Sequence, residues 1–108
     1  MRRVTLHHHG PAGVVEIDGT LDIVAGYDLR RVFGHALRST TGVLSLDLSR
    51  VSAADGDGVA ALRWCSEQAI AARRVLMWAT CSRPLARDLR AQVGTVRAPR
   101  GRPRTPRT

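Results

Sequence analysis

Two aspartates separated by glycines form the segment of this sequence with the clearest chemical potential, which runs Asp55-Gly56-Asp57-Gly58. Carboxylates at this spacing could ligate a metal ion or accept a phosphoryl group. A calcium loop of the EF-hand type also needs Asp or Asn at its fifth position and Glu at its twelfth. Counted from Asp55, those positions hold Val59 and Ser66, and no further acidic cluster or lysine accompanies the segment. We therefore predict no metal or phosphoaspartate here, but a turn that caps a helix or a loop that faces a partner.

Three consecutive histidines and two cysteines are the other groups that could bind a metal or act in catalysis. On a strand only His7 and His9 share a face, and no cysteine or acidic residue lies at ligand spacing beside them. Neither Cys65 nor Cys81 is close to a histidine in the sequence, and two cysteines define no disulfide framework. The chain also has no Gly-x-Ser-x-Gly motif and no phosphate-binding glycine loop before a lysine. We predict a protein that is not an enzyme and carries no cofactor.

Short apolar runs predict the strands that must position these groups. We expect strands over 4–9, 14–18, 43–48 and 75–79, with the first two joined at Pro11-Ala12-Gly13. In the third strand Leu44, Leu46 and Leu48 share one face.

Helical spacing of apolar residues predicts the intervening helices. Asp22 is a suitable cap for the first, which should end near 39–42. Its expected buried stripe is Leu29, Val32, Phe33, Ala36 and Leu37. A second helix is expected over about 57–72, with the stripe Val59, Leu62, Cys65 and Ala69. A third should run from Ser82 to Gly94. The order is β-β-α-β-α-β-α, which predicts an α/β fold with a small, mixed and mostly parallel sheet packed by about three helices.

The positive charge is concentrated at the C-terminus. The formal net charge is +8, and residues 97–108 hold five arginines and no acid among prolines and glycine. Such a segment has little to bury, so we predict a disordered, solvated tail. It lacks aromatic residues for base stacking, so a nucleic-acid partner is the less favoured interpretation. Without a secretory signal or a run of 18 apolar residues, we expect a cytoplasmic protein with no membrane partner.

Two local motifs, together with this element order, resemble the STAS domain of bacterial anti-sigma factor antagonists. Gly19-Thr20-Leu21-Asp22 is similar to the Gly-Glu-Leu-Asp that the family carries between its second strand and first helix. The run from Leu46 to Ser49, followed by Asp55-Gly56-Asp57-Gly58-Val59, is similar to the family's strand, loop and Asp-Ser-Ser-Gly-Leu. The resemblance covers roughly residues 3–94. It implies a STAS-like domain over 1–96, followed by the tail 97–108.

The resemblance also implies a mechanism. In the family the unphosphorylated domain binds an anti-sigma factor, usually a serine kinase, which phosphorylates the first Ser of Asp-Ser-Ser-Gly and breaks the complex. Here that position is Gly56, which has no hydroxyl, and the next is Asp57. Either the domain has lost its off switch, or the Asp57 carboxylate partly imitates the phosphorylated state and weakens binding. A second departure is that only 95–97 remain for the family's fifth strand, which leaves a sheet edge exposed.

The function that follows is a regulatory protein that sequesters an anti-sigma factor of the serine-kinase type. We expect the contact surface to centre on the loop 53–58 and the start of the second helix. The residues predicted to bind the partner are Asp22, Asp55, Gly56, Asp57, Gly58, Arg63 and Trp64. Trp64 lies off the buried stripe, so it is either a partner anchor or a cover for the edge of its own core. The alternatives are a STAS-like scaffold subunit of another signalling or transport complex, or a basic nucleic-acid-binding module.

Overall fold

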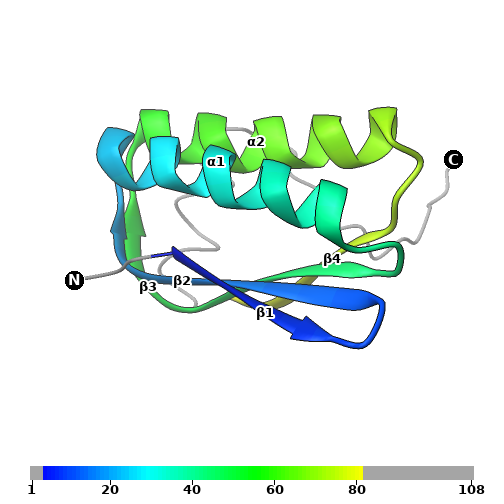
Figure 1. Cartoon of the computed structure of the whole chain (residues 1–108). Coiled ribbons are helices and arrows are strands. Elements are labelled where there is room, and N and C mark those ends of the chain that lie inside the picture. The colour runs from blue at the N-terminus through cyan, green and yellow to red at the C-terminus, as the bar shows by residue number, and fades with distance from the viewer. Residues whose placement is uncertain (1–3, 82–108) are drawn as a thin grey trace, which may run out of the picture.

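Four strands form one mixed sheet in the order β1-β2-β3-β4 (Figure 1). The computed structural model describes residues 4–81, and for 79–81 only the backbone. β1 (Val4–His9) pairs antiparallel with β2 (Ala12–Leu21). β2 pairs parallel with β3 (Leu44–Ala54), and β3 pairs parallel with β4 (Leu76–Cys81). The predicted mixed, mostly parallel sheet is thus confirmed.

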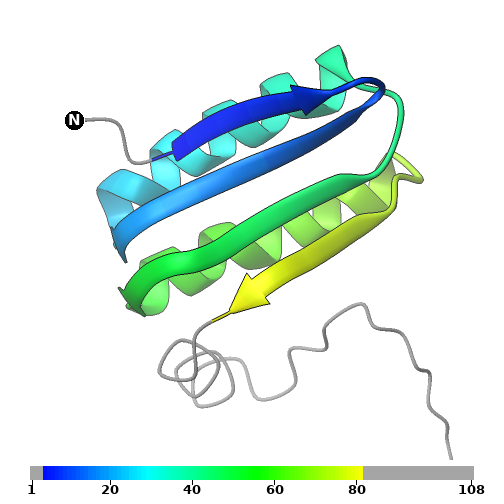
Figure 2. The same cartoon turned by 90° about the horizontal axis from the view of Figure 1, so that it is seen from below.

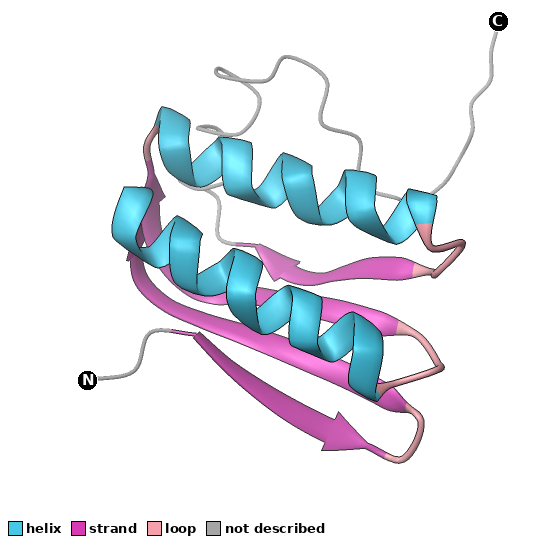
Figure 3. Ribbon diagram, turned by 45° about the horizontal axis from the view of Figure 1, so that its top comes forward, coloured by secondary structure: helices cyan, strands magenta, loops and turns pink. Residues whose placement is uncertain are grey.

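Two helices connect the parallel strands and lie side by side on one face of the sheet (Figures 1 and 3). α1 (Ile23–Ser39) joins β2 to β3, and α2 (Gly56–Ala71) joins β3 to β4. A helix crossover is the usual way to link parallel neighbours. The third helix predicted from Ser82 to Gly94, the short segment 95–97 and the tail 97–108 lie outside the described residues.

The core lies between the helices and the sheet, where the apolar faces of both pack together. Val15 and Ile17 of β2 alternate inward, and Leu44, Leu46 and Leu48 of β3 are fully buried as predicted. Each buried leucine stabilises the fold by roughly 1.5–3 kcal/mol. Both predicted helical stripes are buried except for Leu37, which is partly buried against the core.

The opposite face of the sheet carries polar side chains (Figure 2 views the sheet from this side). Glu16 Oε1 lies 3.1 Å from His7 Nε2, and Glu16 Oε2 lies 3.8 Å from Arg50 Nε. Asp47 Oδ1 accepts from the Ser49 hydroxyl at 2.7 Å and from the Ser49 N–H at 3.0 Å. These two hydrogen bonds, with the hydroxyl the larger effect, hold the pKa of Asp47 below its ordinary value.

The strands are longer than the sequence predicted. β3 continues to Ala54, whereas the sequence predicts that the strand ends at residue 48 and that residues 53–58 form a loop; residues 53 and 54 belong to β3, and 56–58 belong to α2. Val51 and Ala54 are buried, and they pair with β2 beyond the first and the second of two register shifts, so Ser52 between them lies on a strand. β2 likewise begins at Ala12, which places Gly13 in the strand rather than in the turn.

Arg74 joins three segments at the end of the sheet where the parallel strands begin. Its guanidinium donates to the carbonyl oxygens of Leu37 (3.1 Å) and Gly42 (2.6 and 3.1 Å) and to Thr40 Oγ1 (2.7 Å). The last carbonyls of a helix lack partners within it, and cations are favoured there. The arginine therefore caps the C-terminal end of α1 and fixes the connection to β3.

Candidate partner-binding site

The two helices begin side by side at the end of the sheet where β2 and β3 finish. Leu21, the last residue of β2, pairs directly with Ala54, the last residue of β3. Each strand is followed by one aspartate and then a helix, so Asp22 and Asp55 lie at the same end of the sheet. The Asp55 N–H also donates to the Leu21 carbonyl at 3.2 Å, which ties the start of α2 to the end of β2.

Both aspartates cap their helices. Asp22 Oδ1 accepts from the N–H of Ala25 at 3.0 Å, and Asp55 Oδ1 accepts from the N–H of Gly58 at 2.9 Å. Each bond satisfies one of the orphan donors at a helix N-terminus. Asp22 therefore caps α1 as predicted. The second cap is Asp55, so α2 begins at Gly56, one residue earlier than expected.

Gly58 and Gly26 permit the close approach of these elements. A Cβ on Gly58 would lie 1.9 Å from the carbonyl oxygen of Leu21, and a Cβ on Gly26 would lie 3.2 Å from the Cβ of Ala61. Gly58 is also buried, in contrast to its expected place on a partner surface. Its part in the site is to let α2 start against the end of β2.

Gly56, Asp57 and Arg63 are exposed, whereas Trp64 is partly buried. Gly56 and Arg63 are two helical turns apart and so share one outward strip of α2. Trp64 turns toward α1, where its ring meets Phe33 edge to face with centroids 6.5 Å apart. Of the two interpretations of Trp64, the structure therefore favours a cover for the core between the helices and not an anchor for a partner.

An apolar patch on α1 was missed by the sequence reasoning. Ile23, Val24 and Tyr27 are 49 %, 65 % and 64 % exposed. They flank Gly26 in the sequence, and an added Cβ on Gly26 would lie 3.6 Å from the Asp57 carbonyl oxygen, so this part of α1 lies next to the start of α2. A helical plot centred on the buried stripe would have placed these apolar residues outside it. We define the helix-start surface as Ile23, Val24, Tyr27, Gly56 and Asp57.

The helix-start surface offers groups for binding. Gly56 has no hydroxyl, and Ser49 and Ser52 are exposed farther back on β3. Cys65, farther along α2, is fully buried, and desolvation raises the pKa of its thiol. Within residues 4–81, no three His, Cys, Asp or Glu side chains gather closely enough to hold a metal ion.

None of the helices in the described part of the chain is long and apolar enough to cross a membrane.

Comparisons with known proteins agree with this architecture at the level of the fold. No protein-family model matches the sequence, and no curated protein matches it. Among solved structures, the anti-sigma factor antagonist SpoIIAA in its unphosphorylated form matches with a TM-score of 0.69 and 18 % identity, over 84 % of this chain and 80 % of that one. The Bacillus cell fate determinant SpoIIAA in its phosphorylated form matches with a TM-score of 0.67 and 18 % identity, over 84 % and 83 %.

A third solved structure, that of Mglu, matches with a TM-score of 0.68 and 14 % identity over 77 % of this chain. The match covers only 21 % of Mglu, so this chain spans about a fifth of that protein. Sheet order, crossover helices and these likenesses together identify the chain as having a STAS-like fold, that of the anti-sigma factor antagonist SpoIIAA.

Proposed function

We propose that this protein is an anti-sigma factor antagonist-like regulator that binds an anti-sigma factor of the serine-kinase type through its helix-start surface. The observation that carries the proposal is the side-by-side start of α1 and α2. There the two capped helix ends expose Asp57 on α2 and the apolar side chains of Ile23, Val24 and Tyr27 on α1.

The chemistry of this surface supports a protein partner. Exposed Tyr and Ile side chains next to a charged residue are typical of an interface centre with a polar rim. The likeness to SpoIIAA, which antagonises an anti-sigma factor, supports the same class of partner for this chain.

The regulation of binding must differ from that of a phosphorylated antagonist. A kinase has no hydroxyl to modify at Gly56. The Asp57 carboxylate lies in the first turn of α2, where a negative charge is favoured by about 0.3–1 kcal/mol. It is a permanent part of the surface, and it either contributes to the contact or imitates the phosphorylated state.

The first experiment is a pull-down with the full chain from its native host, in which the retained proteins are identified. Recovery of a kinase-like anti-sigma factor supports the proposal. Recovery of nucleic acid alone, lost when residues 97–108 are removed, contradicts it and favours a basic nucleic-acid-binding module. Tight recovery of a partner without a kinase domain favours a scaffold role.

Affinity measurements on the recovered partner then test the surface itself. Asp57→Asn removes the charge and keeps the shape. Weaker binding identifies Asp57 as a contact, and tighter binding identifies it as an imitation of the phosphorylated state. Arg38→Gln in the last turn of α1 is the control, because it also changes the net charge by one unit. Unchanged affinity for Asp57→Asn contradicts a role for charge on the helix-start surface.

A second variant tests the kinase assignment. Gly56→Ser restores a hydroxyl at the exposed first position of α2. A serine-kinase partner should phosphorylate this variant and release it, while the wild-type protein stays bound. Phosphate incorporation is followed by mass spectrometry. A partner that phosphorylates neither protein contradicts the serine-kinase class.

A further inference from the structure

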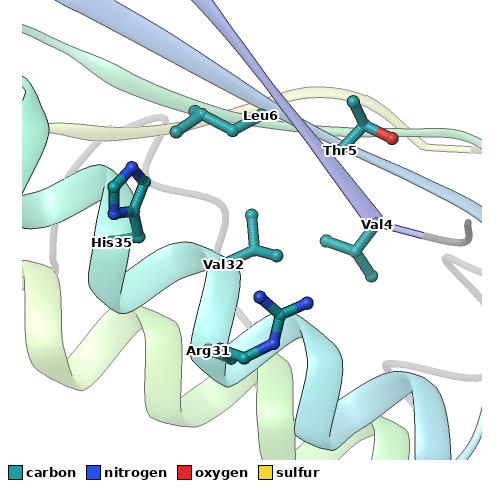
Figure 4. A pocket seen from close by; sticks show the side chains of 6 residues that line it. All are labelled: Val4, Thr5, Leu6, Arg31, Val32 and His35. Atoms are coloured by element: carbon teal, nitrogen blue, oxygen red, sulfur yellow. The ribbon is translucent and has the colours of Figure 1, made fainter.

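A separate cleft of about 450 Å³ lies between β1 and α1 (Figure 4). Val4 and Leu6 point from β1 toward the helix, and Val32 and His35 point from α1 toward the strand. The guanidinium of Arg31 turns toward Val4 in the same space. Binding sites for small molecules usually have volumes of about 300–1,000 Å³, so the cleft has the size of a ligand site.

The lining divides into an apolar floor and a cationic rim. Val4 is 0 % and Val32 is 8 % exposed, and the partly buried Leu6 packs against the same core. Arg31 and His35 supply the polar groups on the helix side, and Thr5 borders the cleft on the strand side. Among the described residues that line the cleft there is no acidic side chain. A ligand that complements it has an apolar body and a negative head group.

Arg31 keeps donors available for such a head group. Its Nη2 pairs with Asp28 Oδ1 one turn earlier on α1. A guanidinium has five N–H donors in a planar fork, and this pairing uses one edge of it. The Arg31 side chain is 66 % exposed, so a ligand carboxylate can reach the remaining donors.

The cleft is lined by none of the residues that define the helix-start surface. Val32 and His35 face β1, on the flank of α1 opposite to the one where Gly26 and Phe33 face α2. The ligand titration and the affinity measurements on the partner therefore test different side chains.

From this arrangement we propose that the β1–α1 cleft binds a free monocarboxylate with an apolar chain, of the medium-chain fatty acid class. The chain lies on Leu6 and the accessible edge of Val32, and the carboxylate accepts from Arg31. Because the floor is apolar and the cleft is open to solvent on one side, affinity should rise with chain length by less than the roughly fourfold per methylene that full burial gives.

The test is an NMR titration of the full chain with butyrate, hexanoate and octanoate, and with octan-1-ol as the neutral match for octanoate. The expected result is saturable shifts of amide signals in β1 and α1, with affinity rising along the series and octanoate binding more tightly than octan-1-ol. Arg31→Gln should weaken octanoate binding about fivefold, the upper range for an exposed ion pair, and leave octan-1-ol unchanged. Arg38→Gln, on the same helix but outside the cleft, should leave both ligands unchanged.

Three results would overturn the proposal. The first is the absence of saturable shifts in β1 and α1. The second is equal affinity for octanoate and octan-1-ol. The third is an equal loss of octanoate affinity in Arg31→Gln and Arg38→Gln, which would show a response to overall charge and no specific site. Amide spectra of the unliganded variants establish that each remains folded.

Discussion

The carbonyl oxygen of Leu21 occupies the space that a side chain on Gly58 would need, because a Cβ at position 58 would lie 1.9 Å from that oxygen. The Leu21 oxygen is also the acceptor for the Asp55 N–H, so it cannot move without loss of a hydrogen bond. The close contact between the end of β2 and the first turn of α2 therefore requires glycine at position 58.

Gly58→Ala should therefore destabilise the protein by about 3 kcal/mol, at the upper range for overpacking of a core. Urea unfolding measures the change in the free energy of unfolding. Gly34→Ala is the matched control, because a Cβ there meets nothing closer than the Arg38 Nη1 at 3.5 Å. That substitution in a helix interior should stabilise by about 0.4–1 kcal/mol. Equal effects of the two alanines would contradict the close approach at Gly58.

The cap of α2 should depend on the oxygen of Asp55 and not on its charge alone. Asp55→Ala removes the acceptor for the Gly58 N–H and should lower the free energy of unfolding by about 1 kcal/mol. Asp55→Asn keeps an oxygen in place and should retain most of that stability. Asp57→Ala, in the same turn, controls for loss of a carboxylate near the helix N-terminus. If the asparagine variant is as unstable as the alanine variant, the capping hydrogen bond is not the cause.

Arg74 should be important for stability although it lies far from the helix-start surface. Arg74→Ala leaves the carbonyl oxygens of Leu37 and Gly42 without their charged donor, so we expect a loss of about 2 kcal/mol. Arg74→Lys should recover only part of this, because an ammonium group cannot span both carbonyls with a planar fork. Thermal and urea unfolding measure both variants, with the exposed Arg63→Ala as control. Full recovery by lysine would mean that charge alone matters.

Acid should weaken the protein through Asp47. Its folded-state pKa is lowered, chiefly by the Ser49 hydroxyl, so the ionised form stabilises the fold above the ordinary value of 3.8. This contribution is lost as the pH falls from that value through the lower folded pKa. Ser49→Ala should bring the Asp47 pKa closer to its ordinary value and flatten this part of the stability profile. Unfolding free energies measured from neutral pH to below 3.8 test this, and identical profiles for the two proteins would refute it.

The burial of side chains was the part of the fold that the sequence predicted best. Leu44, Leu46 and Leu48 alternate in a run that only a half-buried strand explains, and they are buried. Val59 and Leu62 follow the helical period and are buried as well. Both patterns depend on local spacing, which a single sequence contains.

The sequence did not predict features that depend on neighbouring elements. Arg50 and Ser52 interrupt the apolar pattern of β3, and the strand continues only because β2 pairs with it across register shifts. The sequence does not predict the exposed patch of Ile23, Val24 and Tyr27, because helical periodicity indicates which apolar residues face inward and says nothing about those that stay exposed. Trp64 could be assigned to the core only once Phe33 was known to lie beside it.

The sheet topology also bears on the order in which the chain folds. β1 and β2 are joined by a tight turn, so their pairing closes a short loop and can form early. Leu21 and Ala54 are neighbours in the sheet, yet a whole helix separates them along the chain, so their contact carries a larger loop-closure entropy. We therefore expect the β1–β2 hairpin to precede the parallel pairs. The helix-start surface, which exists only when β2 and β3 end together, then forms after the hairpin.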